Sequence, residues 1–142
     1  MKQHISSIFV LLALMMTSTG CTHNGGDIGI WFGTWSVDRY FIDGQQQQLD
    51  PNGLGTAYYI QFQRSVICVR YTDALHNGGE SYGSWVESDD GTSMTIDFDP
   101  SNYDVRLLPQ NATYSITRSD HRHVSLRTTD SGGREHEYDL SR

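Results

Sequence analysis

From residue 29 to the end of the chain, apolar and polar side chains alternate with a period of two. Segments rich in Tyr, Val, Ile, Thr and Trp are separated at short intervals by clusters of Gly, Asp, Asn and Ser. This pattern is typical of short antiparallel strands joined by turns. No segment keeps the 3.6-residue spacing over ten or more positions that an amphipathic helix requires. The sequence therefore predicts an all-β domain.

Nine runs are expected to form strands, the sixth of them only weakly. They cover residues 29–42, 56–63, 66–72, 81–88, 92–98, 103–108, 113–118, 121–129 and 134–141. The four glutamines at 45–48 are expected to form a loop. About eight sequential strands with short connections close naturally into an up-and-down barrel, which leaves no exposed edge. The predicted fold is therefore a single antiparallel up-and-down barrel, with room for a packed core or one small ligand.

The register of three hairpins follows from their turns, because a slip of one residue would move each apolar face into solvent. A two-residue Asp-Gly turn at 90–91 would pair Trp85 with Ile96 and Gly83 with Phe98. A turn at 64–65, two residues long or longer, would join two further strands. Their shared face would carry Tyr58, Ile60, Phe62, Ile67, Val69 and Tyr71.

The last hairpin needs an odd-numbered loop, because Val124 and Leu126 must share a face with Tyr138 and Leu140. The segment Ser-Gly-Gly at 131–133 fits a three-residue loop with a glycine in the left-handed region. The outward face then places basic and polar side chains of one strand against acidic ones of the other, which favours the pairing.

The first twenty residues have the organisation of an export signal. A short basic start that includes Lys2 precedes an apolar run at 5–16, which suits a signal-peptide core and is too short to span a bilayer. Small residues then precede Cys21, as in the lipobox of bacterial lipoproteins, although Ser18 stands where that motif usually has leucine. We expect cleavage after residue 20 and lipidation of Cys21, which would anchor the chain to a membrane. Ordinary secretory cleavage is the alternative.

These boundaries predict a signal peptide at 1–20, the lipidated cysteine with a short tether at 21–28, and one barrel domain at 29–142. After cleavage, nine arginines face seventeen acidic residues, since Lys2 is the only lysine. So acidic a domain should repel nucleic acid. The expected location is the cell envelope, anchored through Cys21. The absence of acidic residues at 22–24 favours the periplasmic side of the outer membrane.

The second cysteine, Cys68, would be left without a disulfide partner if Cys21 carries lipid. It lies in an apolar strand-like run at 65–71, where a free cysteine usually behaves as a small buried hydrophobe. No local motif supplies the histidine that a nucleophilic cysteine would need.

The Gly-Thr-Trp segment that ends at Trp35 is similar to the Gly-x-Trp signature of lipocalins, and the residues that follow it, 36–44, resemble the opening of small lipocalin-like lipoproteins of Bacteroides-type bacteria. The resemblance implies a cupped barrel that binds a small apolar molecule. It also implies that Trp35 plugs the closed end and that an arginine, Arg134 or Arg142, packs across it. A core aromatic is the alternative role for Trp35.

Aromatic and apolar residues on the inward faces are the candidates to line such a cup. They are Tyr58, Phe62, Tyr71, Trp85, Met94, Ile96 and Phe98. In a collapsed barrel the same residues would pack together.

Histidines offer the most suggestive metal-binding pattern, but we expect no metal and no cofactor. His121 and His123 lie two apart on one strand, while His136 belongs to the opposite face by the register above. No nucleophile elbow, phosphate-binding glycine loop or zinc-protease motif is present.

The sequence therefore predicts a membrane-anchored, non-enzymatic lipoprotein with a lipocalin-like barrel that binds a small apolar ligand. The alternative is a filled barrel that serves a structural or protein-binding role, with Tyr59, Tyr82 and Tyr103 as candidates for an exposed patch. An envelope enzyme, or a metal binder that uses the strand histidines, is the third hypothesis. The sequence does not identify a protein partner.

Overall fold

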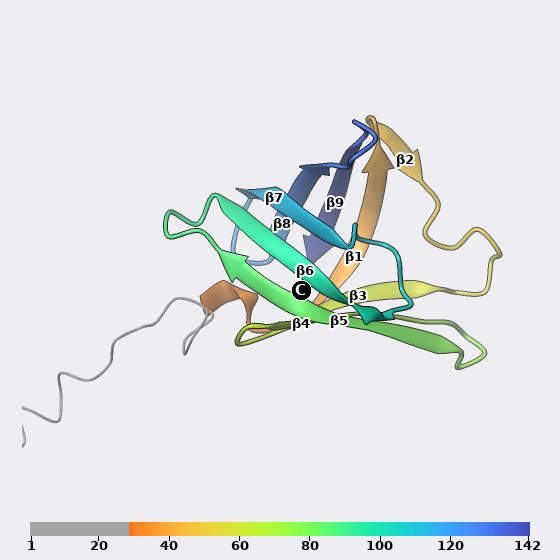
Figure 1. The fold of residues 1–142 in the computed structure, drawn as a ribbon. Coiled ribbons are helices and arrows are strands. Elements are labelled where there is room, and N and C mark those ends of the chain that lie inside the picture. Colours follow the sequence, from red (N-terminus) through yellow and green to blue (C-terminus); the bar gives the residue numbers. More distant parts are fainter. Residues whose placement is uncertain (1–28) are drawn as a thin grey trace, which may run out of the picture.

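One antiparallel sheet runs through the whole of residues 29–142, which are the residues that the computed structural model describes (Figure 1). Within them, a short 3₁₀ helix, η1, precedes nine strands. The elements are η1 (Gly29–Trp31), β1 (Gly33–Ile42), β2 (Gln45–Gln47), β3 (Ala57–Gln63), β4 (Val66–Thr72), β5 (Gly78–Glu87), β6 (Ser93–Tyr103), β7 (Asn111–Arg118), β8 (His123–Thr129) and β9 (Glu135–Ser141).

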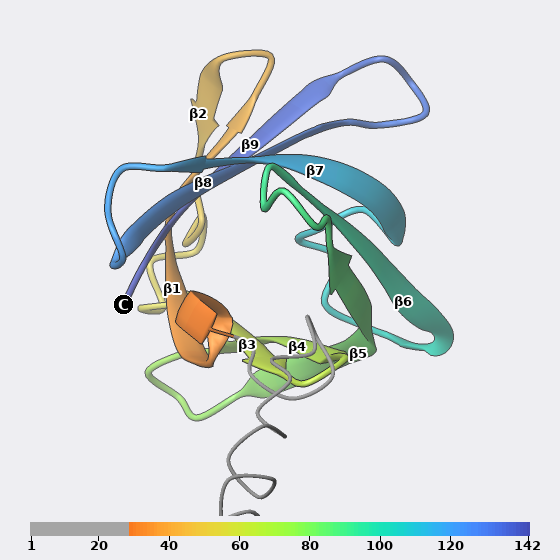
Figure 2. The ribbon, with the colours of Figure 1, turned by 90° about the vertical axis from the view of Figure 1, so that its left-hand side faces the viewer.

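The sheet closes because β1 pairs with strands on both of its edges (Figure 2). Its first residues pair with β3, and from Ser36 onwards it pairs with β9. The short strand β2 lies beside the far end of β1, where β3 no longer does. The result is an eight-stranded closed barrel with one additional strand, which confirms the predicted fold class.

The three predicted registers are confirmed. Trp85 pairs with Ile96 and Gly83 with Phe98. The connection between the two strands is longer than the predicted two residues. The last backbone hydrogen bond of the hairpin, 2.9 Å long, joins Ser88 to Ser93 and leaves residues 89–92 as the loop. The Asp90 carboxylate holds this longer loop by accepting hydrogen bonds from the hydroxyl of Ser88 and the backbone N–H of Thr92.

The other two connections have the predicted lengths. Arg64 and Ser65 form a two-residue turn, with Arg64 in the left-handed region at φ 46°. The β8–β9 loop has three residues between Asp130 and Arg134, which share a backbone hydrogen bond of 2.9 Å. Gly133 takes φ 82° in this loop, as the turn type requires.

Three sequence-based assignments are wrong. The glutamines at 45–47 form β2 because Asp43 and Gly44 both have positive φ, the backbone of a tight I′ hairpin turn that folds the chain back onto β1. The expected strand at 103–108 does not form, since β6 ends at Tyr103 and the chain then turns into the barrel. The first strand begins at Gly33 and not at residue 29.

One end of the barrel, which we call the closed end, is filled by aromatic side chains. Here η1 places Trp31 among three other rings, with ring centroids 5.6 Å from Trp35, 5.0 Å from Phe62 and 6.2 Å from Trp85. All four side chains are at most 1 % exposed. Figure 2 views the barrel from this end, with η1 in front. The aromatic cluster therefore seals the end of the barrel where the described chain begins.

The opposite end, which we call the mouth, is crossed by residues 104–110, the strap. Val105 and Leu108 of the strap are buried inside the barrel. Ser81, itself fully buried, donates a hydrogen bond to the carbonyl of Val105 and accepts one from its N–H, at 3.1 and 2.7 Å. The hydroxyl of Tyr138 donates to the carbonyl of Leu107 at 2.9 Å. These bonds hold the strap across part of the mouth. No helix within residues 29–142 has the length and apolar character needed to cross a bilayer.

Candidate ligand site at the mouth of the barrel

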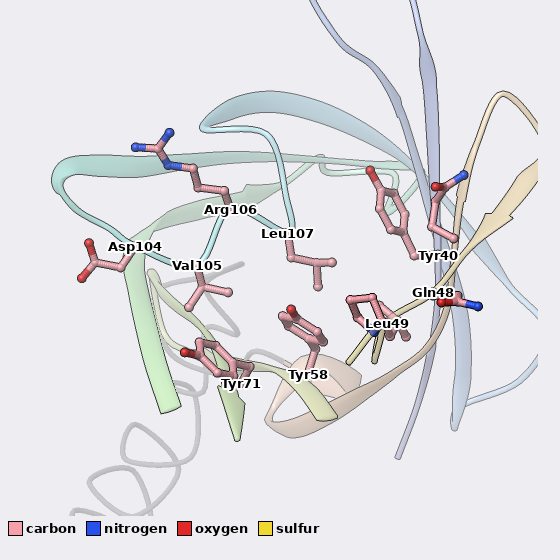
Figure 3. A pocket seen from close by; sticks show the side chains of 11 residues that line it. Tyr40, Gln48, Leu49, Tyr58, Tyr71, Asp104, Val105, Arg106 and Leu107 are labelled. Carbon is pink, nitrogen blue, oxygen red and sulfur yellow. The ribbon is translucent and has the colours of Figure 1, made fainter. Parts of the chain in front are cut away.

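A hollow of about 460 Å³ lies at the mouth, between the strap, the far end of β1 and the adjoining ends of β3 and β4 (Figure 3). This volume falls within the usual range for small-molecule sites. Its lining residues are Tyr40, Gln47, Gln48, Leu49, Pro51, Tyr58, Tyr71, Asp104, Val105, Arg106 and Leu107.

Three tyrosines form the aromatic part of the wall. Tyr58 of β3 and Tyr71 of β4 are direct register partners and lie side by side, with ring centroids 5.9 Å apart and ring planes tilted by 41°. Tyr40 lies on β1 and stacks on Tyr138 at 4.7 Å, with the two ring planes 3° apart. Burial raises the pKa of Tyr40 and of Tyr58, so both phenols keep their protons at neutral pH. The wall therefore combines apolar ring surface with neutral hydroxyl groups.

The strap and the β2–β3 connection supply the aliphatic part of the wall. Figure 3 shows Leu107 and Leu49 approaching the same space as Tyr58, and Val105 lying beside Tyr71. Asp50 shapes the β2–β3 connection, because its carboxylate accepts the backbone N–H groups of Leu54 and Gly55 at 3.0 and 2.8 Å.

A partly buried hydrogen-bond relay, centred on buried His136, reaches the hollow from β9. The Nε2 atom of His136 lies 2.8 Å from the Asp130 carboxylate, and its Nδ1 atom lies 2.8 Å from the Tyr40 hydroxyl. The hydrogen bond from His136, with others from the backbone of Arg134 and Gly132, holds the pKa of Asp130 far below its usual range. Asp130 is therefore an ionised acceptor, and it fixes the Nε2 atom of His136 as a donor.

The predicted ligand-binding residues separate into two groups. Tyr58 and Tyr71 line the hollow. The other five belong to the packed core, where each is at most 1 % exposed, and none of them lines this hollow: Phe62, Trp85, Met94, Ile96 and Phe98. Phe62 and Trp85 are covered by Trp31, a residue that belongs to η1 and not to the expected first strand.

Trp35 lies in the aromatic cluster of the closed end and is fully buried. Its indole Nε1–H donates to the carbonyl of Trp31 at 3.3 Å. The guanidinium of Arg142, directly after β9, lies 5.0 Å from the ring centroid of Trp35. The other candidate partner, Arg134, lies at the mouth and pairs with Asp130 at 3.2 Å.

The two cysteines differ in what the structure says of them. Cys21 lies outside the described residues. Cys68 is a free, buried cysteine, as expected, on β4 opposite Tyr82 of β5. Burial raises the pKa of the Cys68 thiol, which makes it a poor nucleophile.

The strand histidines do not come together. His123 pairs with Asp120 beside the β7–β8 turn, whereas His136 is buried in the relay. Within residues 29–142, no three side chains of the metal-ligating types gather into a site.

Sequence reasoning missed several residues of the hollow, notably Tyr40, Leu49 and the strap residues Val105 and Leu107. Tyr40 lies in a run that was expected to form a strand, but its hydrogen bond with His136 joins residues 96 positions apart and leaves no local signal. In the strap, the pair of leucines at 107–108 is the local signal of burial, and by itself it does not distinguish a buried loop from a strand.

Searches with family models and against curated proteins find no match for this chain. Among the solved structures that resemble it, two from Bacteroides species illustrate the fold. A lipocalin-like protein from Bacteroides uniformis shares 18 % identity at a TM-score of 0.58, over 80 % of this chain and 99 % of the other. An uncharacterized protein from Bacteroides eggerthii shares 14 % identity at a TM-score of 0.57, over 79 % of this chain and 98 % of the other.

The fold is therefore that of a lipocalin-like β-barrel, closed at one end and hollowed at the other. The resemblance to lipocalin-like proteins of Bacteroides, predicted from the Gly-Thr-Trp segment, is confirmed for the fold.

Proposed function

We propose that this chain is a membrane-anchored, non-enzymatic lipocalin-like protein that binds a small, largely apolar ligand at the mouth of its barrel. The observation that carries the proposal is the hollow of about 460 Å³ lined by three tyrosines and by aliphatic side chains of the strap. Tyr58 and Tyr71 are the predicted residues that we assign to ligand contact. The five core residues form the packed body of the barrel beneath the site.

A binding role agrees with the chemistry of the relay. A nucleophilic tyrosine would need a lowered pKa, whereas burial raises that of Tyr40. The Nδ1 atom of His136 is engaged by Tyr40, and its Nε2 atom by Asp130, so neither ring nitrogen is open to a substrate. The relay therefore suits the positioning of a wall residue better than general-base catalysis.

We further propose that lipid on Cys21 anchors the barrel in the cell envelope, on the periplasmic side of the outer membrane. The seven residues at 22–28 reach at most about 25 Å when fully extended. Gly29 enters the barrel at the closed end, opposite the mouth. An anchor at Cys21 would thus leave the mouth free to face away from the membrane.

The site is tested on the chain from residue 21 with Cys21→Ser, which keeps the whole described barrel. Titration with N-phenyl-1-naphthylamine, a neutral aromatic probe, should give saturable fluorescence enhancement. Tyr71→Ala removes one wall of the hollow and should weaken probe binding about tenfold, because an aromatic contact and its buried area are lost. Tyr82→Ala is the matched control, since Tyr82 lies on the outer surface of β5 and does not line the hollow. Equal affinities for the two variants would refute a site at the mouth.

A second candidate function is binding of a protein partner by a largely filled barrel. It is favoured by three exposed side chains on adjacent strands β4 and β5: Val66, Tyr82 and Val86. Site-specific photo-crosslinking from position 86 in intact cells should then give one defined adduct that Val66→Asp abolishes. A ladder of unspecific adducts would count against this alternative.

A further inference from the structure

We infer that the ligand of the mouth carries a positively charged, hydrogen-bond-donating group, such as an alkylammonium, on an apolar body. The inference rests on the proposed function and specifies the chemical class of molecule that the hollow would take. Three features of the wall point to it: the hydrogen-bond polarity of Tyr40, the faces of three tyrosine rings, and the charges around the rim.

The relay determines which kind of hydrogen bond Tyr40 can make. Asp130 accepts from Nε2–H of His136, and in the tautomer that carries its proton on Nε2 the Nδ1 atom has a lone pair. In this tautomer the hydroxyl of Tyr40 donates its single proton to Nδ1, at 2.8 Å. The oxygen of the Tyr40 hydroxyl can then accept a hydrogen bond from a ligand but has no proton left to donate to it. A group that donates hydrogen bonds therefore matches Tyr40, whereas a carboxylate would meet lone pairs.

The ring faces in the hollow favour a cation for an independent reason. Tyr40, Tyr58 and Tyr71 all line the same space (Figure 3), and the stacked ring of Tyr138 covers one face of Tyr40. The faces of aromatic rings carry partial negative charge, and several rings around one space are a common way to bind ammonium groups.

The charges at the rim act in the same direction. Asp50 and Asp73 line two further hollows that adjoin this one and share Leu49 with it. Desolvation opposes ionisation of Asp50, but hydrogen bonds from the backbone of Gly55 and Leu54 outweigh it and lower the pKa of this carboxyl. The hydrogen bond from the Asn77 side chain lowers the pKa of Asp73. Both residues are therefore anionic at neutral pH.

The strap adds one residue of each sign, Asp104 and Arg106. The guanidinium of Arg106 lies 5.8 Å from the ring centroid of Tyr103, outside the set of lining residues. Figure 3 shows this side chain extended away from Leu49 and Tyr58. Arg106 is thus placed poorly to hold an anion inside the hollow.

The test uses three probes of one chain length: decylamine, decanol and decanoate. The two ions are added below their micelle concentrations and decanol below its solubility limit, at pH 7, to displace N-phenyl-1-naphthylamine from the chain that carries Cys21→Ser. The amine is then protonated and the acid ionised. We expect decylamine to bind about tenfold more tightly than decanol, and decanoate to bind more weakly than either. Added NaCl should reduce the advantage of the amine.

Two rim variants change the charge in opposite directions without touching a relay residue. Asp104→Asn should weaken decylamine about threefold and leave decanol unchanged, whereas Arg106→Gln should strengthen decylamine. Asp89→Asn, in the β5–β6 connection at the closed end, is the matched control and should change neither. Equal binding of all three probes, or tightest binding of decanoate, would overturn the charge inference while leaving the ligand site standing. Failure of all three to displace the fluorescent probe would overturn the proposed site itself.

Discussion

Trp31 gives the most direct test of how the closed end is built. Trp31 is 1 % exposed and contacts the rings of Trp35, Phe62 and Trp85, and the guanidinium of Arg118 lies 5.4 Å from its ring centroid. Replacing a buried tryptophan with alanine costs about 3–5 kcal/mol, since transfer energy is lost and a cavity remains. The three ring contacts place Trp31→Ala in the upper half of that range, at about 4 kcal/mol.

A loss of this size is measurable by urea unfolding followed by circular dichroism. With an m-value of about 2 kcal/mol per M, the midpoint should fall by about 2 M without a change in slope. Phe32→Ala is the matched control, because Phe32 is the next residue and its side chain is 70 % exposed. We expect it to change stability by less than about 0.5 kcal/mol. If Trp31→Ala were as mild as Phe32→Ala, η1 would not seal the barrel, and the assignment of a closed end would be wrong.

Three further predictions concern the strap, a loop carboxylate and the anchor. Ser81→Ala should cost about 1–3 kcal/mol in chemical denaturation, because it leaves the buried N–H and carbonyl of Val105 without their partner; Ser84→Ala on the outward face of β5 should be nearly neutral. The hydroxyl of Ser88 and the backbone of Thr92 lower the pKa of Asp90 to about 2 from 3.8, so its ionised form stabilises the fold above pH 4 and this contribution is lost as the pH falls towards 2. The difference in stability between wild type and Asp90→Asn should therefore shrink between pH 5 and pH 2, and a constant difference would contradict the assigned hydrogen bonds. Cys21→Ser should move the exported chain from the membrane fraction to the soluble fraction of the envelope, and continued membrane association would argue against a lipid anchor on this residue.

The registers were predictable because two independent signals had to agree. In the β8–β9 hairpin, the apolar faces demanded an odd loop, and a glycine pair stood where such a loop needs a left-handed residue. In the β5–β6 hairpin, the same reasoning found the register but not the loop length. Side-chain hydrogen bonds of Asp90 stabilise the longer connection, and they have no counterpart in the alternation of apolar residues.

The wrong assignments of β2 and of the strap arose where the alternation of apolar and polar residues does not distinguish a strand from a loop. The glutamines of β2 are polar on both faces, so the Asp-Gly dipeptide at Asp43 and Gly44 was the local signal for this hairpin. In the strap, Val105 and Leu108 are apolar and buried, which is also what a strand would give. Their burial comes from a loop that turns into the barrel and is held by Ser81, 24 residues earlier in the chain. Such long-range partners are not visible in local sequence patterns.

For the candidate site, the sequence predicted which residues face inward but not which of them line the hollow. Inward-facing residues could be assigned from the alternation, and all seven candidates do face the interior or the hollow. Whether such a residue packs or lines a cup depends on what fills the space in front of it. At the closed end Trp31 fills that space for Phe62 and Trp85, whereas beside Tyr58 and Tyr71 the strap leaves it open.

The two ends of the barrel can therefore carry stability and binding separately. The aromatic cluster at the closed end buries large rings in close contact, and in such packing each removed atom costs free energy. At the mouth, Tyr58, Tyr71 and Leu107 are only partly buried, so exchanging them would disturb the core less while changing the shape of the hollow directly. Tyr40 is the exception, because its hydroxyl is tied to buried His136 on β9, the strand that closes the barrel against β1. The hydrogen bonding of Tyr40 therefore depends on a contact between two strands of the barrel and not on the hollow alone.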